Sequence, residues 1–424
     1  MILFNGTLFE TKEQNRLLDE LPSKLTDTLL HQTLDRENVI RAFDNISQRL
    51  AAGEFESLLQ SVDPDSASLY MDQIVRMMSR DYLQKKTEIE FHGVRNDNEK
   101  IQTQEVPLGV IFHIAAGNMD VLPIASIGEG LLAGNINILK LPSVDRGLTI
   151  QALKMLVDAE PALKDFIYVF DTPSSDIAAM KKLADLSDGI AIWGGDEVVH
   201  AVRAFAKPGT RLIEWGHKLG FAYISGYENE ETELTELAEH ILMTRQLLCS
   251  SCQVIYIDTD KYDEALSFAG RFLPYLERAF EKHPIREIGG VAELTLRRYE
   301  ERIEKHLHGD EASEDKRSRF QGQHTSVTVK KDPDLELSYM YGNVIVKPLP
   351  AKNLADVLRK SKGYLQTAGL ICSPEKRDAL TLQLTRCGVQ RVTRAGHMSS
   401  LFEGEAHDGE FALARYSRFI NIEN

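Results

Sequence analysis

The feature that most constrains the fold is a series of short apolar runs separated by segments of helical periodicity. The runs are GVIFHI (109–114), NINILK (135–140), DFIYVF (165–170) and GIAIW (189–193). Residues 122–132, 148–157 and 177–186 lie between them and repeat apolar side chains at helical spacing. Apolar runs separated by helices are typical of parallel strands buried on both faces. The pattern predicts an open, doubly wound α/β sheet.

A second α/β series occupies the other half of the chain. An apolar stripe at helical spacing (234–241) leads into LLCSSCQVIYID, in which residues 254–257 indicate a buried strand. After a charged stretch of helical character (276–318), the runs GNVIVKPL and GLICS predict further strands. The first hundred residues are predicted to be mostly helical. We therefore expect a domain boundary near residue 245, with the functional site between the two halves.

Composition excludes several classes of partner. The chain has 424 residues and a net charge of −15 with no Lys/Arg-rich run, which argues against nucleic-acid binding. No apolar segment reaches the length of a membrane span, and the N-terminus does not resemble a signal peptide. Four cysteines do not make a disulfide framework. We expect a cytoplasmic protein.

Cys249 is the first candidate for chemistry. It opens CSSCQ, after a predicted helix and before a buried strand, at an edge of the sheet where reactive groups concentrate. The two serines that follow keep the turn small and polar, so an acyl group could approach a thiolate there. Three other interpretations stay open: a packed apolar residue, a zinc ligand, and a redox dithiol with Cys252. A second C-x-x-C for zinc is absent from the sequence, and no metal site is predicted.

Two groups of glycines differ in how well they fit a dinucleotide site. Gly128, Gly130 and Gly134 resemble a loose fingerprint but fall on a predicted helix and just after it, which is the wrong context. Gly194 and Gly195 follow the strand GIAIW and precede a helix, where backbone N–H groups could hold a pyrophosphate. An ordinary tight turn is the alternative for this pair.

Glu214 and His407 are the remaining candidates from the residues alone. Glu214 ends the run RLIE beside Trp215, where a carboxylate with a raised pKa could transfer protons. A surface carboxylate is the alternative. The sequence His407-Asp408-Gly409 indicates either a charge-paired histidine near a site or a simple turn, and the turn is favoured.

Taken in order, these segments resemble the aldehyde dehydrogenase superfamily. VPLGVIFHIAAGN is similar to its first cofactor-domain strand and the loop that ends in an oxyanion-stabilising Asn, here Asn118. NINILKLPS is similar to the strand whose Lys contacts the adenosine ribose, here Lys140. GIAIWGGDEVV corresponds to the pyrophosphate turn, IEWGHK to the acid–base Glu, and RQLLCSSCQ to the nucleophile segment. The resemblance therefore implies Cys249 as nucleophile, Glu214 as acid–base residue, and Gly194 and Gly195 as cofactor contacts.

Within that superfamily the chain resembles the fatty acyl-CoA reductases of bacterial luminescence, the LuxC family. QLLCSSCQ is similar to their nucleophile stretch, and the run from GYLQTAGLICS to HDG is similar to their ending. The resemblance covers roughly residues 40–424. Cys252 stands where those proteins commonly have proline, and the chain is shorter than most of them. A long-chain substrate specificity is therefore not implied.

The resemblance implies an acyl-CoA or acyl-protein reductase that forms an aldehyde through an acyl group on Cys249. Asn118 and the backbone N–H of Cys249 would stabilise the oxyanion. Ser143 stands where NAD-selective relatives have Glu, so NADPH is the expected cofactor, with NADH tolerated. An acyl-protein synthetase is the expected partner. The alternatives are an NAD(P)-dependent aldehyde dehydrogenase that forms an acid and, in another class, a non-catalytic scaffold.

The resemblance also implies an aldehyde dehydrogenase-like division of the chain. Helices and an NAD(P)-binding domain would occupy residues 1–245, and a catalytic domain residues 246–409. Residues 87–104, where TEIEFHGV alternates polar and apolar residues, would form a bridging hairpin, and residues 410–424 a bridging tail. Superfamily members use such elements to join subunits, so we expect a homo-oligomer.

Overall fold

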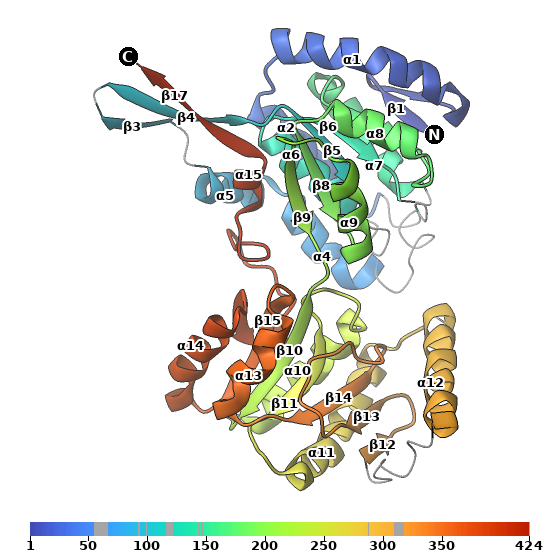
Figure 1. Cartoon of the computed structure of the whole chain (residues 1–424), viewed down its shortest axis with the longest axis vertical. Coiled ribbons are helices and arrows are strands. Elements are labelled where there is room, and N and C mark those ends of the chain that lie inside the picture. Colours follow the sequence, from blue (N-terminus) through green and yellow to red (C-terminus); the bar gives the residue numbers. More distant parts are fainter. Residues whose placement is uncertain are drawn as a thin grey trace. The chain divides into compact units, whose positions relative to one another are not determined.

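The chain forms two compact units. The computed structural model describes residues 1–54, 67–91, 94–98, 100–115, 122–142, 145, 147–286, 288–308 and 318–423. Unit 1 consists of Met1–Gly216 and Leu401–Asn424, and unit 2 of His217–Ser400 (Figure 1). The division comes before the predicted boundary near residue 245. The strand that follows Gly216 belongs to the second sheet, and the next helix packs on that sheet. The segment that returns to unit 1 begins at Leu401, before the predicted residue 410.

Unit 1 is built on one large sheet. Its strands are β1 (Ile2–Phe4), β2 (Thr7–Phe9), β5 (Val110–Ile114), β6 (Ile136–Lys140), β7 (Ile167–Phe170), β8 (Gly189–Trp193) and β9 (Arg211–Trp215). They lie in the order β2-β1-β7-β6-β5-β8-β9, and the five strands from β7 to β9 are parallel. The predicted doubly wound parallel sheet is therefore confirmed. Winding reverses between β5 and β8, and ligands bind at the carboxyl ends of strands at such a switch point.

Helices of unit 1 include most of the described N-terminal residues, as predicted. They are α1 (Gln14–His31), α2 (Arg36–Ala51), α4 (Ala67–Met78), α5 (Arg80–Glu90), α6 (Leu122–Leu132), α7 (Leu148–Ala159), α8 (Ile177–Asp185), α9 (Asp196–Phe205) and α15 (Ala412–Arg415). The start of the chain differs from the prediction, because β1 and β2 form a hairpin that pairs with β7. Asn5 and Gly6 turn this hairpin with φ of 47° and 75°, as a two-residue turn requires.

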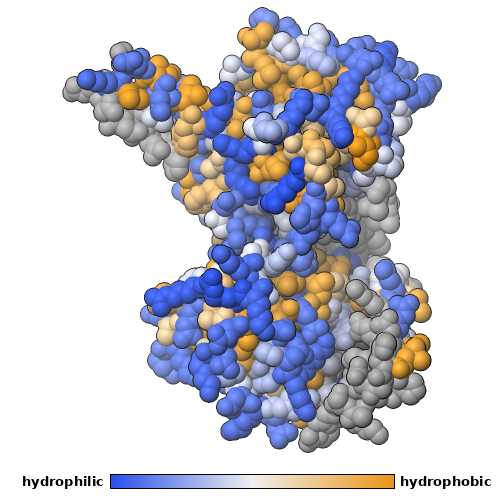
Figure 2. Space-filling model, viewed as in Figure 1, coloured by the Kyte–Doolittle hydropathy of each residue, from blue (hydrophilic) through white to orange (hydrophobic). Residues whose placement is uncertain are grey.

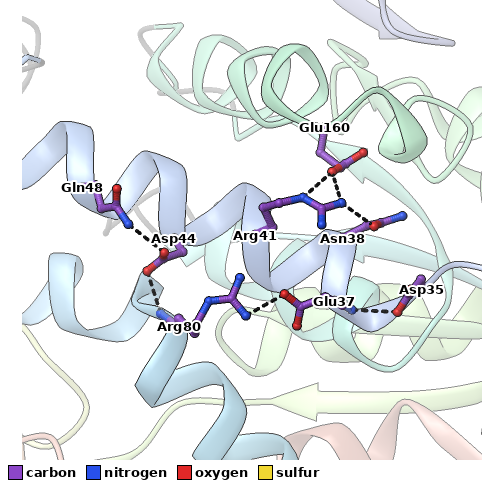
Figure 3. A network of polar contacts seen from close by, with 8 residues as sticks. All are labelled: Asp35, Glu37, Asn38, Arg41, Asp44, Gln48, Arg80 and Glu160. Carbon is purple, nitrogen blue, oxygen red and sulfur yellow. Dashed lines mark hydrogen bonds and ion pairs between the residues drawn. The ribbon is translucent and has the colours of Figure 1, made fainter.

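A surface network ties α2 to its neighbours in unit 1 (Figure 3). Arg41 of α2 donates to Glu160 at the end of α7 through two nitrogens, at 2.9 and 2.6 Å. Arg80 at the start of α5 donates to Glu37 of α2 at 2.6 Å. These groups are exposed or half-buried, so the network orients the helices while the buried apolar core stabilises them.

The C-terminal segment returns to unit 1 and completes it. A second, three-stranded sheet has the order β17-β4-β3, with β3 (Val94–Asn98), β4 (Ile101–Pro107) and β17 (Ser417–Glu423). Figure 1 shows this sheet as an arm that extends from the rest of unit 1. The prediction of a strand at TEIEFHGV is wrong for residues 87–90, which are the last turn of α5. Four alternating residues do not distinguish a strand from the end of a helix.

Unit 2 contains the second large sheet. Its strands are β10 (Leu219–Ser225), β11 (Cys252–Ile257), β12 (Arg319–Gln321), β13 (Ser326–Val329), β14 (Asn343–Pro348), β15 (Leu365–Cys372) and β16 (Arg391–Arg394). The order is β12-β13-β14-β11-β10-β15-β16, and all pairs except β12 with β13 are parallel. The strands predicted at VIYI, GNVIVKPL and GLICS are β11, β14 and β15.

Helices cover both faces of the unit 2 sheet. They are α10 (Glu230–Thr244), α11 (Tyr262–Lys282), α12 (Ile288–His308), α13 (Leu354–Leu358) and α14 (Arg377–Cys387). Alternate residues of β10 point to opposite cores: Ala222 packs with α10 and α11, and Phe221 packs with α13 and α14. The stretch 276–318, predicted to be helical, contains the end of α11 and the helix α12, and residues 309–317 lie outside the described residues. Among the described residues, no helix is long and apolar enough to span a membrane.

Candidate active site

Cys249 lies on a short turn of unit 2 between α10 and β11, as predicted. The helix ends at Thr244, and Arg245 and Gln246 then adopt left-handed φ angles of 50° and 61°. The chain passes through a turn closed by a hydrogen bond from Ser251 N to Leu248 O at 2.9 Å and enters the sheet at Cys252. Cys249 is exposed on this turn.

The two thiols of the C-x-x-C have different surroundings. Cys252 is fully buried, and burial raises the pKa of its thiol to about 12. Its Sγ lies 3.6 Å from Val254 O. A buried protonated thiol is a poor nucleophile, whereas an exposed one can meet a substrate. Within the described ranges there is no cluster of three or more His, Cys, Asp and Glu residues suited to a metal ion.

Polar contacts and close backbone packing fix the Cys249 turn. Leu248 N donates to Ser251 Oγ at 3.0 Å, and the hydroxyls of Ser250 and Ser399 lie 2.7 Å apart. Gly220 of β10 lies directly against the turn: a Cβ there would stand 2.6 Å from Ser251 O and 2.9 Å from Ser250 O. The position therefore admits only glycine without displacement of the turn.

The predicted cofactor residues of unit 1 gather at the carboxyl edge of its parallel sheet. Lys140 ends β6 and is only 4% exposed. Burial lowers the pKa of the Lys140 ammonium, and the nearby carboxylate of Asp171 opposes that shift. Gly194 and Gly195 follow β8, the strand beside the switch point. The sheet therefore brings the two predicted elements of a dinucleotide site to one edge.

The Gly194-Gly195 turn is open beside Gly195 and close-packed beside Gly194, where a Cβ would stand 3.1 Å from Val198 Cβ. Gly195 caps α9, and a Cβ added there would meet no atom within 4 Å, so the space beside its backbone is open. Asp196 and Glu197 occupy the first turn of the same helix. Their negative charge offsets part of the attraction that a helix N-terminus has for an anion.

Glu214 lies in β9 of unit 1 and its carboxylate is held by Arg203 of α9. Arg203 Nε and Nη2 donate to the two carboxylate oxygens, each at 2.6 Å. The carboxylate raises the pKa of the Arg203 guanidinium through these hydrogen bonds and its charge. The pair lines an open cavity of about 530 Å³ on the β9 side of the unit. In this arrangement each carboxylate oxygen of Glu214 accepts a hydrogen bond from Arg203.

His407 belongs to a turn, the interpretation favoured from the sequence. Its backbone N–H and C=O pair with those of Glu410 at 2.9 and 3.0 Å, and Asp408 and Gly409 between them have positive φ. The imidazole lies against the indoles of Trp193 and Trp215, with ring centroids 5.7 and 5.0 Å away. This turn of the returning segment thus packs beside the end of β8, next to the glycine turn.

Two predicted site residues, Asn118 and Ser143, lie outside the described residues. Other polar residues near Cys249 were not predicted: the side chains of Gln246, Gln253 and Ser338 are buried beneath its turn. Their side chains form hydrogen bonds with residues up to 96 positions away, so no local sequence pattern predicts these contacts.

Comparison with known proteins agrees with the fold. Residues 31–419 match the family described as acyl-CoA reductase (LuxC). Long-chain acyl-protein thioester reductase 2 of Photobacterium leiognathi is 23% identical over 187 residues, 42% of this chain and 39% of that protein. The match thus spans about two fifths of that relative's length.

Solved structures of aldehyde dehydrogenases share the fold. Methylmalonate-semialdehyde dehydrogenase from Oceanimonas doudoroffii has a TM-score of 0.74 at 12% identity, with 100% of this chain and 97% of that chain covered. NADP-dependent glyceraldehyde-3-phosphate dehydrogenase from Bacillus halodurans, complexed with NADP, has a TM-score of 0.73 at 14% identity, with 100% and 98% covered. These similarities confirm the predicted aldehyde dehydrogenase-like fold. With the family match over most of its length, the chain belongs to the LuxC family of acyl-CoA reductases.

Proposed function

We propose that this protein reduces an acyl thioester to an aldehyde and carries the acyl group on Cys249 during the reaction. The observation that supports this most directly is the contrast between the two neighbouring thiols: Cys249 is exposed on a braced turn, whereas Cys252 is buried and protonated. The match to a family described as acyl-CoA reductase supports the proposed reduction of an acyl thioester.

The first step is an acyl transfer to the protein. The thiolate of Cys249 attacks the thioester carbonyl, its sulfur bonds to the acyl carbon, and the bond to the donor's sulfur breaks, so the donor leaves as a thiolate. The backbone N–H of Cys249 and the side-chain amide of Asn118 are the proposed hydrogen-bond donors to the oxyanion. The donor is proposed to be acyl-CoA or an acyl carrier loaded by an acyl-protein synthetase.

The carboxyl edge of the unit 1 sheet is the proposed cofactor site. Gly194 and Gly195 would hold the pyrophosphate, and Lys140 would contact the adenosine ribose. Bound there, NADPH would supply the hydride that reduces the acyl carbon. The chain's part is to hold the oxyanion until the bond between carbon and Cys249 sulfur breaks, which releases aldehyde and restores the thiolate.

Glu214 bears on whether the acyl group leaves as aldehyde or as acid. An aldehyde dehydrogenase that works in the hydrolytic direction needs a carboxylate free to activate water. The two bonds from Arg203 engage Glu214 instead, which favours reduction over hydrolysis. We therefore propose the reductive direction and keep oxidation of an aldehyde to an acid as the second candidate.

Cofactor choice and cellular setting complete the proposal. Ser143 carries no charge that would repel a 2′-phosphate, so NADPH is preferred and NADH is tolerated. Comparison of apparent affinities for the two cofactors tests this, and a clear preference for NADH would contradict it. An exposed nucleophilic thiol is maintained in a reducing compartment, so we propose a cytoplasmic enzyme.

A labelling experiment tests the proposed function. Wild-type protein incubated with radiolabelled acyl-CoA in the absence of NADPH should retain a label that hydroxylamine removes. Cys249→Ala should abolish both the label and aldehyde formation, whereas Cys252→Ala should keep both. Label that persists in Cys249→Ala and disappears in Cys252→Ala would reverse the assignment. Acid from aldehyde and NAD would favour the second candidate, and no turnover in either direction would indicate a non-catalytic protein.

A further inference from the structure

Backbone strain in the described chain concentrates beneath the Cys249 turn. Six described residues other than glycine have positive φ, and four of them meet here. Arg245 and Gln246 leave α10 at 50° and 61°, and Met340 and Tyr341 precede β14 at 54° and 48°. Tyr341 N donates to Arg245 O at 3.0 Å, so the two strained turns are bonded to each other. Such residues persist only where their surroundings determine them, and they gather at functional sites.

The side chain of Gln246 connects three segments around the nucleophile. It is fully buried, its Nε2 donates to Cys252 O at 3.0 Å, and its Oε1 accepts from Gly342 N at 3.2 Å. One amide thus spans the turn that carries Cys249, from the residue three places before the thiol to the residue three places after it. Both partners are backbone groups of fixed polarity, so only one orientation of the amide satisfies them.

Gln253 braces the same turn from the sheet. Its Nε2 donates to Gln246 O at 2.8 Å. Its Oε1 accepts from Ser338 N at 3.1 Å and from Ser338 Oγ at 2.8 Å. The hydroxyl of Ser338 also accepts from Met340 N at 3.0 Å. The two glutamines therefore lock the left-handed exit of α10 against the left-handed turn before β14.

We infer that Gln246 and Gln253 are positioning residues that set the place of Cys249 for acyl transfer, with Ser338 as their anchor. This inference rests on the proposed function. Each amide acts as donor and acceptor at once, and a carboxylate of the same shape loses the donated bond while placing its charge against a carbonyl oxygen. A shift of the turn by a fraction of an ångström alters the alignment of sulfur, carbonyl carbon and oxyanion donors, to which acyl transfer is sensitive.

Substitutions that remove single hydrogen bonds test the inference. Gln253→Glu removes the bond to Gln246 O, and Ser338→Ala removes the hydroxyl while the backbone N–H of residue 338 remains. The rate of Cys249 acylation by radiolabelled acyl-CoA should fall at least tenfold in the first variant and about threefold in the second. Ser338→Thr, which keeps a hydroxyl, should restore it. Alkylation of Cys249 by iodoacetamide, which needs no oxyanion donors, should stay within about twofold of wild type.

Ser225→Ala is the matched control. Ser225 is also buried and hydrogen-bonded, to Asp258 and Lys376, but it ends β10 at the opposite edge of the same sheet. Acylation in this variant should match wild type.

The outcomes separate the inference from the function on which it rests. Acylation at the wild-type rate in folded Gln253→Glu and Ser338→Ala overturns the inference alone. If the rates of acylation and of alkylation fall by the same factor in a variant, the inference is also overturned, because a parallel loss indicates general disruption of unit 2. If Gln253→Glu does not fold, Ser338→Ala and its Thr rescue decide. A wild-type protein that takes no label at Cys249 overturns the proposed function, and the inference with it.

Discussion

Gly220→Ala should slow acylation of Cys249 while the protein still folds. The added methyl would stand 2.6 Å from Ser251 O, about 0.8 Å short of the ordinary contact distance of 3.4 Å. Both neighbours it meets, Ser250 O and Ser251 O, are backbone atoms that cannot rotate away. The turn must therefore move by several tenths of an ångström. Since a misplacement of about 1 Å costs roughly 100-fold in rate, we expect a fall of about ten- to 100-fold.

A single-turnover measurement of label transfer from acyl-CoA, with Tm measured in parallel, checks this expectation. Overpacking should cost the folded state about 1–3 kcal/mol, which lowers Tm without unfolding a unit of this size. Gly216→Ala is the control, because a Cβ there meets no atom within 4 Å. Wild-type label transfer in folded Gly220→Ala would refute the reasoning, as would an equal loss in Gly216→Ala.

Three further predictions concern other parts of the chain. Arg203→Ala should free the Glu214 carboxylate and raise the share of acyl-enzyme released as acid. The double variant Arg203→Ala/Glu214→Gln should return that share to the wild-type value. An unchanged ratio of acid to aldehyde in Arg203→Ala would contradict the role of the pair. Burial lowers the pKa of His113 to about 4 and of His240 to about 3, so the unfolded chain binds more protons below its histidine pKa of about 6.5. The free energy of unfolding should therefore fall as the pH drops from about 6.5 toward 4, and urea titrations in which it stays level would contradict this. Figure 2 shows apolar surface on the arm, and deletion of residues 419–424 removes two of its exposed apolar side chains, those of Phe419 and Ile422. This deletion should lower the oligomeric state in light scattering, and an unchanged oligomer would exclude the arm from assembly.

The deletion begins after residue 418 because the preceding residues belong to the core of unit 1. Leu413 and Tyr416 are fully buried, and Tyr416 O accepts hydrogen bonds from Asn135 Nδ2 and Leu108 N. A deletion of the whole predicted tail, residues 410–424, would damage the fold of unit 1 as well as any interface. Loss of assembly in that longer deletion would thus have two explanations.

The elements that could be predicted from the sequence are those whose local pattern does not depend on partners far away in the chain. Strands β5 to β8 were predicted to within two residues because a buried parallel strand is apolar along its whole length, whatever its partners. The β1–β2 hairpin was missed because its three-residue strands become recognisable only through pairing with β7. The residues 87–90 were misassigned because their alternation is too short to exclude the end of a helix.

The candidate site was predictable only in part for a related reason. The flanking sequence placed Lys140 at a strand end and Cys249, Gly194 and Gly195 on turns beside strands, and the roles of these residues stay predictions. The engagement of Glu214 by Arg203 could not be predicted, since it depends on how α9 packs against β9. The hydrogen bonds of Gln246 and Gln253 could not be predicted either, because their partners Gly342 and Ser338 lie 96 and 85 residues away in the sequence.

The position of unit 2 within the sequence of unit 1 has a consequence for biosynthesis. Unit 2, residues 217–400, is continuous, so all of it is synthesised before residues 401–424 of unit 1 are made. Unit 1 lacks β17, α15 and the buried Tyr416 until the final two dozen residues leave the ribosome. The three-stranded sheet of unit 1 must therefore stay incomplete, with β4 unpaired on the side that β17 will occupy, after unit 2 has been synthesised. A chain released from the ribosome after residue 400 should contain a folded unit 2 tethered to an incomplete unit 1.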